Sequence, residues 1–432
     1  MLYRFILLVY SNLFLTTIPF ILMKKMIQSR HNKAHRQRWF ERLGQVKFSL
    51  KKSILIHSVS VGESISIAPL VKQISIEYSD ISIVVTTMTL TGSTQVTKLY
   101  QNYTGIYHTY LPYDIPLCLN NFFQHINPQI CIIMETELWP NLLAICYKKS
   151  IPVILTNARM SKKSFNIYSK IKFITQNMLS HISHINAQNS QDKDRFVSLG
   201  MRLKNITVTG NIKYDFLLDP NVIRQGRSLK EQIGKRPIWI AASTHRTEEE
   251  IILQAHLRIQ SQYPQALLII VPRHPERFDT VYRIIKKYKF RVIRRSFDNG
   301  KYNSLDVYLA DTMGELMMLY AVSDIAFVGG SFSANGGHNT IEPAALSKVI
   351  FSGPSTFNFE QITQSLLKKE ALIVVKSSRD LAAQIIILFQ DKRKQKIMGR
   401  NAFSCYNANK GAFSIQLALI KKFINASKMV DN

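Results

Sequence analysis

The chain has 432 residues, of which 56 are Lys or Arg and 28 are Asp or Glu, so its formal charge is +28. Because a single hydrophobic core stops growing near about 250–300 residues, this length predicts two domains. The apolar fraction of 46% excludes a disordered chain and a polytopic membrane protein. Four cysteines in a chain this long argue against a disulfide framework, and the lack of a Cys-x-x-Cys pair argues against a zinc ribbon and a dithiol redox site.

The N-terminal stretch over residues 5–23 carries no charge. At about 1.5 Å rise per residue, a helix of this length just spans a hydrocarbon core of about 30 Å. Residues 24–52 hold ten Lys or Arg and one acid, Glu41. We therefore expect a membrane anchor over 1–23, a basic juxtamembrane segment over 24–52 and a cytoplasmic body. A buried or interfacial helix is the alternative for the anchor, and we expect a chain without residues 1–23 to stay folded and active.

From residue 53 onward, short apolar runs alternate with helical stretches, as in βαβ units of a doubly wound parallel sheet. A first series predicts strands at 54–60, 82–89, 106–111, 129–135, 152–157, 184–188 and 206–210. A second series predicts strands at 238–242, 266–271, 290–293, 307–310, 325–328, 349–352 and 372–375. The fold class is thus α/β, with two Rossmann-like domains over 53–216 and 236–400 and a cleft between them. A polar stretch over 217–235 is predicted to be a linker, and residues 401–432 a basic C-terminal helix.

Three motifs of the first domain place polar groups after predicted strands, where such sheets bind ligands. Glu63 follows a Ser/Gly turn, and it is either a general base or a first-turn acid that favours the helix dipole. Glu135 and Glu137 end an apolar strand, as reactive carboxylates or as helix caps. Lys213 follows a short strand and a glycine, and a solvated surface charge is the competing interpretation.

Two motifs of the second domain indicate an anion site. Arg273 and His274 follow a buried strand, and a guanidinium binds phosphate or carboxylate bidentately. A Gly-rich loop at 329–337 leads into the start of a helix, where free N–H groups would bind an anion. Glu342 lies in the first turn of this helix and could accept hydrogen bonds from a ribose. The alternative is a Gly-rich turn before a capped helix. Neither Gly-x-Gly-x-x-Gly nor Gly-x4-Gly-Lys-Ser/Thr occurs, and no metal-ligand motif is present.

Taken together, these motifs resemble the 3-deoxy-D-manno-octulosonic acid (Kdo) transferases of lipopolysaccharide assembly. The matching strings are SVSVGE at 58–63, TTMTLTGS at 86–93, YLPYDIP at 110–116, METELWPNL at 134–142, NARM at 157–160, VTGNIK at 208–213, AASTH at 241–245, PRHPER at 272–277 and GGHNTIEP at 336–343. One departure is Asn-Thr-Ile-Glu at 339–342, where the family has Asn-Pro-Leu-Glu.

The resemblance implies a GT-B glycosyltransferase of the inner membrane that needs no metal or cofactor, with CMP-Kdo as donor and a tetra-acylated lipid A precursor as acceptor. By resemblance, Glu63 is the general base, and Glu135 and Lys213 stabilise the transition state. The implied CMP site consists of Pro272, Arg273, Met313, Gly314, Glu315, Asn339, Thr340, Ile341 and Glu342.

Charge supports an anionic lipid partner, because residues 1–52 account for only +10 and the body keeps +18. Two alternatives stay open at this point. One is another GT-B transferase acting on a membrane glycolipid, and the other is a membrane-tethered nucleic-acid-binding protein. Against the second, the sequence shows no nucleic-acid motif. The sequence does not indicate an oligomeric state.

Overall fold

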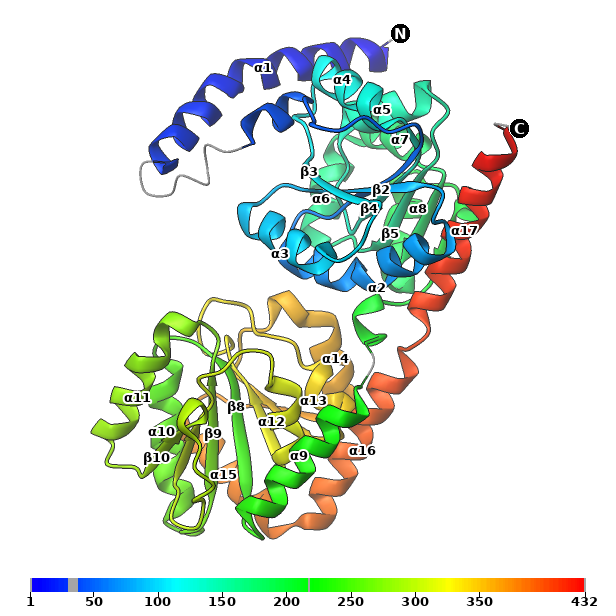
Figure 1. Ribbon diagram of the computed structural model, residues 1–432. Helices are drawn as coiled ribbons and strands as arrows, with labels where there is room; N and C mark the ends of the chain where they lie inside the picture. The colour runs from blue at the N-terminus through cyan, green and yellow to red at the C-terminus, as the bar shows by residue number, and fades with distance from the viewer. Residues whose placement is uncertain (1, 30–37, 217, 431–432) are drawn as a thin grey trace. The chain divides into compact units, whose positions relative to one another are not determined.

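The computed structural model of the protein describes residues 2–29, 38–216 and 218–430, and it contains two compact units. Unit 1 comprises Met1–Asp215 with Lys410–Asn432, and unit 2 comprises Phe216–Asn409. Each unit holds a seven-stranded sheet covered by helices on both faces (Figure 1). All strand pairings are parallel within the part of the chain that is described, which confirms the predicted α/β class and the GT-B type of architecture.

The sheet of unit 1 has the strand order β3-β2-β1-β4-β5-β6-β7. Its strands are β1 (Ser53–His57), β2 (Ser82–Thr87), β3 (Ile106–Tyr110), β4 (Pro128–Met134), β5 (Val153–Ala158), β6 (His184–Ala187) and β7 (Ile206–Val208). Chain order reverses between β1 and β4, which lie side by side. The segments that follow these two strands therefore flank the switch point, where open α/β sheets bind their ligands.

Helices and short 3₁₀ turns connect these strands. The helices of unit 1 are α1 (Leu2–Ser29), α2 (Val61–Glu77), α3 (Leu90–Tyr100), α4 (Pro116–Ile126), α5 (Pro140–Lys148), α6 (Lys162–Lys170), α7 (Lys172–Ser180), α8 (Ser190–Ser198) and α17 (Ala412–Val430), and the 3₁₀ turns are η2 (Trp39–Leu43), η3 (Leu203–Asn205) and η4 (Ile212–Tyr214). Pro116 and Pro140 each occupy a first helical position, where the missing N–H costs nothing.

Both faces of the unit 1 sheet are buried because its central strands carry apolar residues on both sides. Leu55, Cys131 and Leu155 point into one core, whereas Ile54 and Ile132 point into the other. This pattern is the reason why short continuous apolar runs predicted the strands correctly.

The sheet of unit 2 has the order β10-β11-β9-β8-β12-β13-β14, with the reversal between β8 and β12. Its strands are β8 (Ile238–Thr244), β9 (Leu267–Pro272), β10 (Val292–Arg294), β11 (Val307–Leu309), β12 (Ile325–Val328), β13 (Val349–Ser352) and β14 (Leu372–Val374). Its helices are α9 (Pro220–Ile233), α10 (Glu248–Gln260), α11 (Phe278–Lys287), α12 (Leu316–Val322), α13 (Ile341–Ala345), α14 (Glu360–Lys368), α15 (Ser378–Gln390) and α16 (Lys392–Ala408), with 3₁₀ turns η5 (Pro275–Arg277), η6 (Arg295–Phe297) and η7 (Phe357–Phe359).

The predicted linker over 217–235 is wrong for most of its length, because α9 occupies it. Asp219 caps the helix by accepting a hydrogen bond from the Asn221 N–H. Gly226 packs so closely on α12 that a Cβ there would lie 2.6 Å from the Ala321 Cβ. The stretch is polar because only one narrow face of α9 is buried.

The C-terminal segment also differs from the prediction of one helix over 401–432. Two helices, α16 and α17, share it, and α17 belongs to unit 1. Its Ile420 and Ile424 are buried in the core of unit 1, and Gln416 Nε2 donates to Thr209 Oγ1 at 2.9 Å. Residues from the end of the chain therefore complete the first domain.

Candidate active site

Glu63 lies in the first turn of α2, directly after β1. Ser60 and Glu63 form a reciprocal capping box, in which Ser60 Oγ accepts from the Glu63 N–H and donates to Glu63 Oε1 at 2.8 Å. Glu63 Oε2 accepts from the Val59 N–H at 2.9 Å. The carboxylate is therefore fixed in place, while each oxygen keeps a further lone pair for another partner.

Glu135 follows β4 on the other side of the switch point. Its backbone has φ = +56°, a left-handed conformation that is rare for residues other than glycine. Glu135 Oε1 accepts from Lys213 Nζ at 3.0 Å, and both side chains are partly exposed. Asn157, at the end of β5, is also left-handed, and its Oδ1 accepts from the N–H of Ile212, the residue before Lys213. Two strained residues at neighbouring strand ends thus position the ion pair.

The charges of these residues affect one another. Burial raises the pKa of Glu63, and the charge of Glu135 adds to this, whereas Lys213 and the hydrogen bonds from Ser60 and Val59 oppose it. The three predicted catalytic residues, Glu63, Glu135 and Lys213, are thus brought together electrostatically in unit 1.

A fourth ionisable group, Glu137, belongs to the same cluster. Burial, together with the charges of Glu63 and Glu135, raises the pKa of Glu137 to about 7. Carboxyl groups with raised pKa values accept a proton near neutral pH, which is what general-base chemistry requires. From the sequence, Glu137 is a reactive carboxylate or a helix cap beside Glu135, and the family resemblance gives it no role of its own.

The alternative that Glu135 and Glu137 cap the following helix is wrong. Both oxygens of the buried Asp114 carboxylate accept from the first N–H groups of α5, those of Asn141 and Leu142, at 3.0 and 2.9 Å. Because Asp114 supplies the cap, the two glutamates have no role in starting α5.

In unit 2, three histidines gather near the switch point between β8 and β12. His245 Nε2 lies 2.7 Å from His338 Nε2, with the two rings stacked, and His274 approaches His245 edge-on at 5.2 Å between ring centroids. Burial, together with the charges of His245, Arg273 and His274, lowers the pKa of His338 to about 4. The predicted cations at 273–274 therefore converge with the end of the Gly-rich loop.

The Gly-rich loop departs from the expected anion site in one respect. The N–H groups of Gly330, Ser331 and Phe332 all donate to the buried Glu248 carboxylate, at 2.7–2.9 Å. Glu248 also accepts from the His245 N–H. These donors are thus occupied by a carboxylate of the protein itself, and Glu248, in the first turn of α10, fixes the loop. Gly330 is required here because it has φ = +70° and a Cβ would lie 2.8 Å from the His338 ring.

The predicted donor residues at 339–342 form a compact turn. Asn339 Oδ1 accepts from the Ile341 N–H, and Asn339 Nδ2 donates to Glu342 Oε1 at 3.1 Å. Thr340 begins α13 without a capping hydrogen bond from its side chain, so Asn339 performs that function. Burial raises the pKa of Glu342, while Asn339 and the charge of Arg273 lower it, which links this turn to the residues after β9.

The third predicted donor segment, 313–315, follows β11, the neighbour of β9. Met313 is exposed, and Gly314 has φ = +89°. Glu315 forms an ion pair with Arg295 at 2.8 Å and accepts a hydrogen bond from Thr312. Arg295 and Glu315 also border a pocket of about 590 Å³.

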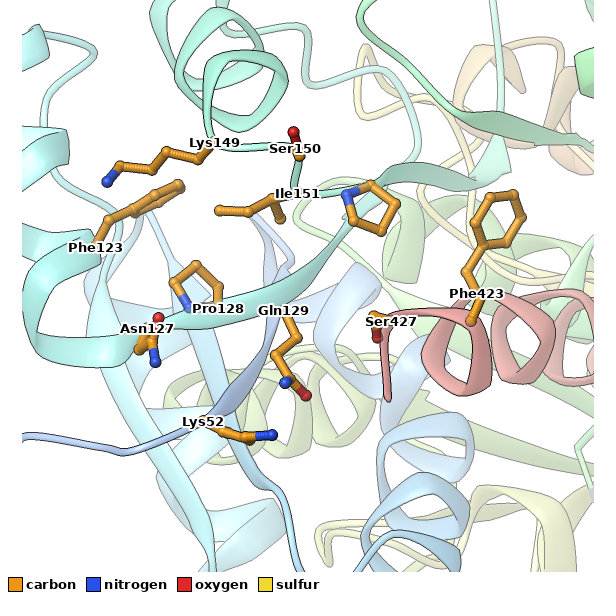
Figure 2. A pocket seen from close by; sticks show the side chains of 12 residues that line it. Lys52, Phe123, Asn127, Pro128, Gln129, Lys149, Ser150, Ile151, Phe423 and Ser427 are labelled. Atoms are coloured by element: carbon orange, nitrogen blue, oxygen red, sulfur yellow. The ribbon is translucent and has the colours of Figure 1, made fainter. Parts of the chain in front are cut away.

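A larger pocket of about 840 Å³ lies in unit 1, at the edge of the sheet formed by the amino-terminal ends of its strands (Figure 2). Lys52 precedes β1, Asn127 precedes β4, and Lys149 follows α5. Because the reactive carboxylates follow the carboxyl ends of the same strands, this pocket is separate from them.

Among the described residues, no group of three His, Cys, Asp or Glu side chains is arranged to hold a metal ion. Transfer without a metal or cofactor stays a prediction.

The His245–His338 pair and the roles of Glu248 and Asp114 were not predicted from the sequence. A signal for the histidines existed, because each lies in a motif of the family resemblance, AASTH or GGHNTIEP. The other two residues act through backbone N–H groups far along the chain, and no local pattern marks such contacts.

Comparisons with known proteins identify the family of the chain. Residues 37–216 match the family model described as 3-Deoxy-D-manno-octulosonic-acid transferase (kdotransferase). The chain is 40% identical to the 3-deoxy-D-manno-octulosonic acid transferase of Haemophilus influenzae, over 96% of this chain and 98% of that protein. It is 30% identical to the enzyme of the same name from Bordetella pertussis, over 84% and 85% of the two chains.

One solved structure shows the fold alone. The crystal structure of a glycosyltransferase from Rickettsia africae is 15% identical and matches with a TM-score of 0.55, over 87% of this chain and 99% of that one. Because a relative of 40% identity matches almost from end to end, the chain belongs to the 3-deoxy-D-manno-octulosonic acid (Kdo) transferase family of glycosyltransferases.

Proposed function

We propose that this Kdo transferase moves Kdo from CMP-Kdo to a hydroxyl group of the tetra-acylated lipid A precursor at the cytoplasmic face of the inner membrane. The observation that supports the catalytic part is the convergence of Glu63, Glu135 and Lys213 at the switch point of unit 1. The body charge of +18 and the basic segment over 24–52 suit an acceptor that carries phosphates.

In the proposed mechanism, Glu63 accepts the proton of the acceptor hydroxyl as the oxygen attacks the anomeric carbon of Kdo. The bond from that carbon to the CMP phosphate oxygen breaks, CMP leaves with the electron pair, and the anomeric configuration inverts. Burial and the charge of Glu135 raise the pKa of Glu63 and so make it a stronger base. Glu135 and Lys213, fixed by their ion pair, present paired charges to the transition state.

Donor binding is proposed for unit 2. Pro272 and Arg273 follow β9, and Asn339, Thr340, Ile341 and Glu342 form the turn described above. The exposed Arg273 side chain would pair with the single phosphate of CMP, and Glu342 would accept from the ribose. Met313, Gly314 and Glu315 would complete the site after β11. A monophosphate leaving group carries little charge, so a cation from the protein can take the place of a metal.

The decisive test is the Glu63→Gln variant. Glutamine preserves the capping box, so α2 stays capped while the base is lost. Removing a general base lowers the rate by about 10²–10⁴-fold. Product formation from CMP-Kdo and the lipid A precursor would be followed by mass spectrometry, with CMP affinity measured by calorimetry and expected to be unchanged.

The matched control is Glu77→Gln, which makes the same substitution in the last turn of α2, where Glu77 pairs with Lys421. We expect its transfer rate to equal that of the wild type. Turnover of Glu63→Gln within a factor of three of the wild type would exclude Glu63 as the base.

A further inference from the structure

Helix α1 is apolar and long enough to cross a membrane by its length and composition, with a mean hydropathy of 1.6 over its best window. The structure nevertheless shows that one face of α1 is covered by the rest of unit 1. The covered positions are spaced by three and four residues, as on one side of a helix. These half-buried or buried residues are Tyr3, Ile6, Leu7, Tyr10, Ser11, Phe14, Ile18 and Ile21.

Apolar contacts hold both ends of this face. Near the start of α1, the Tyr3 ring meets the His181 ring edge-on, with centroids 5.6 Å apart. Near its end, Phe14, Ile18 and Ile21 pack on a small cluster formed by Tyr113, Ile115 and Cys118. The helix therefore lies along the surface of unit 1, beside α4 and α5 (Figure 1).

A buried polar group fixes the middle of α1. Asn141 Nδ2 donates to Ser11 Oγ at 3.0 Å, and the Tyr10 hydroxyl hydrogen bonds to the Asp114 carboxylate. Asp114 also accepts from the Asn141 N–H, so the same carboxylate caps α5 and holds α1. We call Tyr10, Ser11, Asp114 and Asn141 the α1 clamp. Because buried polar groups are costly without partners, the clamp specifies one position of α1 on unit 1.

The outer face of α1 is exposed and largely apolar, although it also carries Asn12, Thr16 and Thr17. Phe5, Leu13 and Phe20 are 63%, 63% and 68% exposed, and they represent the two ends and the middle of the face. The other large apolar residues exposed on α1 are Leu2, Leu8, Val9, Leu15 and Met23. Arg4 lies at one end, and the basic residues from Lys24 onward follow at the other. An apolar face between basic groups matches an anionic lipid surface.

These two faces are incompatible with a spanning helix. From Tyr3 to Ile21 the helix contacts unit 1 over about 27 Å, nearly the full hydrocarbon thickness. A helix that crossed the bilayer while keeping these contacts would draw α4 and α5 into the hydrocarbon. The buried clamp would otherwise have to break and leave Asp114 without its Tyr10 partner.

We propose that α1 lies in the plane of an anionic membrane surface, with its outer face in the boundary between headgroups and acyl chains and its inner face held on unit 1 by the α1 clamp. This inference rests on the membrane attachment in the proposed function. The same Asp114 caps α5, which begins at Pro140, just after Glu135 and Glu137. The helix that touches the lipid is thereby coupled to the loop that carries two of the clustered carboxylates.

The first experiment tests the clamp in the full chain bound to vesicles of phosphatidylethanolamine and phosphatidylglycerol. The double variant Ser11→Cys/Asn141→Cys would be treated with a short bifunctional thiol reagent. The matched control is Asn12→Cys/Asn141→Cys, because Asn12 lies on the exposed face. The native cysteines are buried, and the unsubstituted chain gives their background. We expect at least ten-fold more internal cross-link in the Ser11 pair than in the Asn12 pair.

The second experiment measures how deeply residues of α1 lie in the membrane. Single Phe5→Cys, Leu13→Cys and Phe20→Cys variants would carry a nitroxide, and collision with oxygen and with a water-soluble nickel complex would report the depth of each label. A helix in the membrane plane places all three labels at similar depths, about 5–10 Å below the headgroups. A spanning helix spreads Phe5 and Phe20 over about 22 Å and puts Leu13 near the bilayer centre.

The outcomes distinguish the in-plane position of α1 from the proposed membrane attachment. Equal depths and a selective cross-link support the proposal. Graded depths, or equal cross-linking of the two pairs, overturn it even if the protein binds vesicles and transfers Kdo. A chain that ignores anionic vesicles overturns both the in-plane helix and the membrane attachment, while transfer activity and the Glu63→Gln result are measured independently.

Discussion

Lys213 and Glu135 should shift the ionisation of Glu63 in opposite directions. Lys213 lowers the pKa of Glu63 and Glu135 raises it. Lys213→Met removes the cation and should raise the pKa of Glu63, so that the acid limb of the pH profile of kcat/KM moves to higher pH. Glu135→Gln removes a negative charge and should move the same limb to lower pH. A general base works only when ionised, so the limb reports its protonation.

The size of these shifts follows from how exposed the two charges are. The Lys213 and Glu135 side chains are 32% and 26% exposed, so water screens much of their effect on Glu63. Ion pairs near a surface contribute about 0.2–1 kcal/mol when measured. Since one pKa unit corresponds to about 1.4 kcal/mol, we expect each limb to move by about 0.5 units.

The assay is the initial rate of Kdo transfer between pH 4 and 9, at CMP-Kdo concentrations far below KM. Both variants will also lose rate, so the position of the limb, not its height, is the quantity compared. Salt at 0.5 M should reduce both shifts, because it screens exposed charges. Limbs that move in the same direction, or not at all, would show that Glu63 does not control the profile.

Three further predictions concern single side chains. In the folded protein the pKa of Glu137 rises from 4.5 to about 7, so above pH 7 folding has to hold a charged carboxylate where the neutral form is favoured. Because glutamine stays neutral, Glu137→Gln should raise the Tm by about 2–4 °C at pH 8 and leave it unchanged near pH 4. Glu248→Ala leaves four backbone N–H groups without a hydrogen-bond acceptor and should lower the free energy of unfolding in urea by at least about 3 kcal/mol. The control Glu250→Ala changes an exposed glutamate of the same turn and should have no effect. Arg273→Ala should weaken CMP binding by about 10–100-fold in calorimetry, and an unchanged affinity would remove Arg273 from the donor site.

Strands were the most predictable feature of this chain. Runs such as Ile54–Leu55–Ile56 are apolar on both faces because both faces of the sheet are covered. A continuous apolar run of this kind identifies a central parallel strand without knowledge of its neighbours. The location of Glu63 and Glu135 at strand ends follows from the same pattern, and so does their approach to each other.

Features that depend on distant partners could not be predicted. Helix α9 buries only Gly226, Leu229 and Ile233, so its sequence reads as a polar linker. The N-terminal stretch reads as a separable anchor because local hydropathy cannot reveal that Ser11 and Phe14 contact unit 1. Because of those contacts, deletion of residues 1–23 would uncover an apolar cluster and break the α1 clamp, so the stability of the shortened chain stays a prediction.

The contribution of α17 to unit 1 bears on how the protein is made. Unit 2 is one continuous segment, whereas unit 1 needs residues from both ends of the chain. The β-sheet of unit 1 leaves the ribosome first, but the apolar face covered by Ile420 and Ile424 stays open until α17 has been synthesised. At about 5–20 residues per second, the roughly 200 residues between Asp215 and α17 take about 10–40 s to synthesise. During that interval an apolar surface is exposed to water, so the nascent chain is a candidate for chaperone binding. A ribosome that stalls after unit 2 releases a product whose second domain is finished and whose first is not.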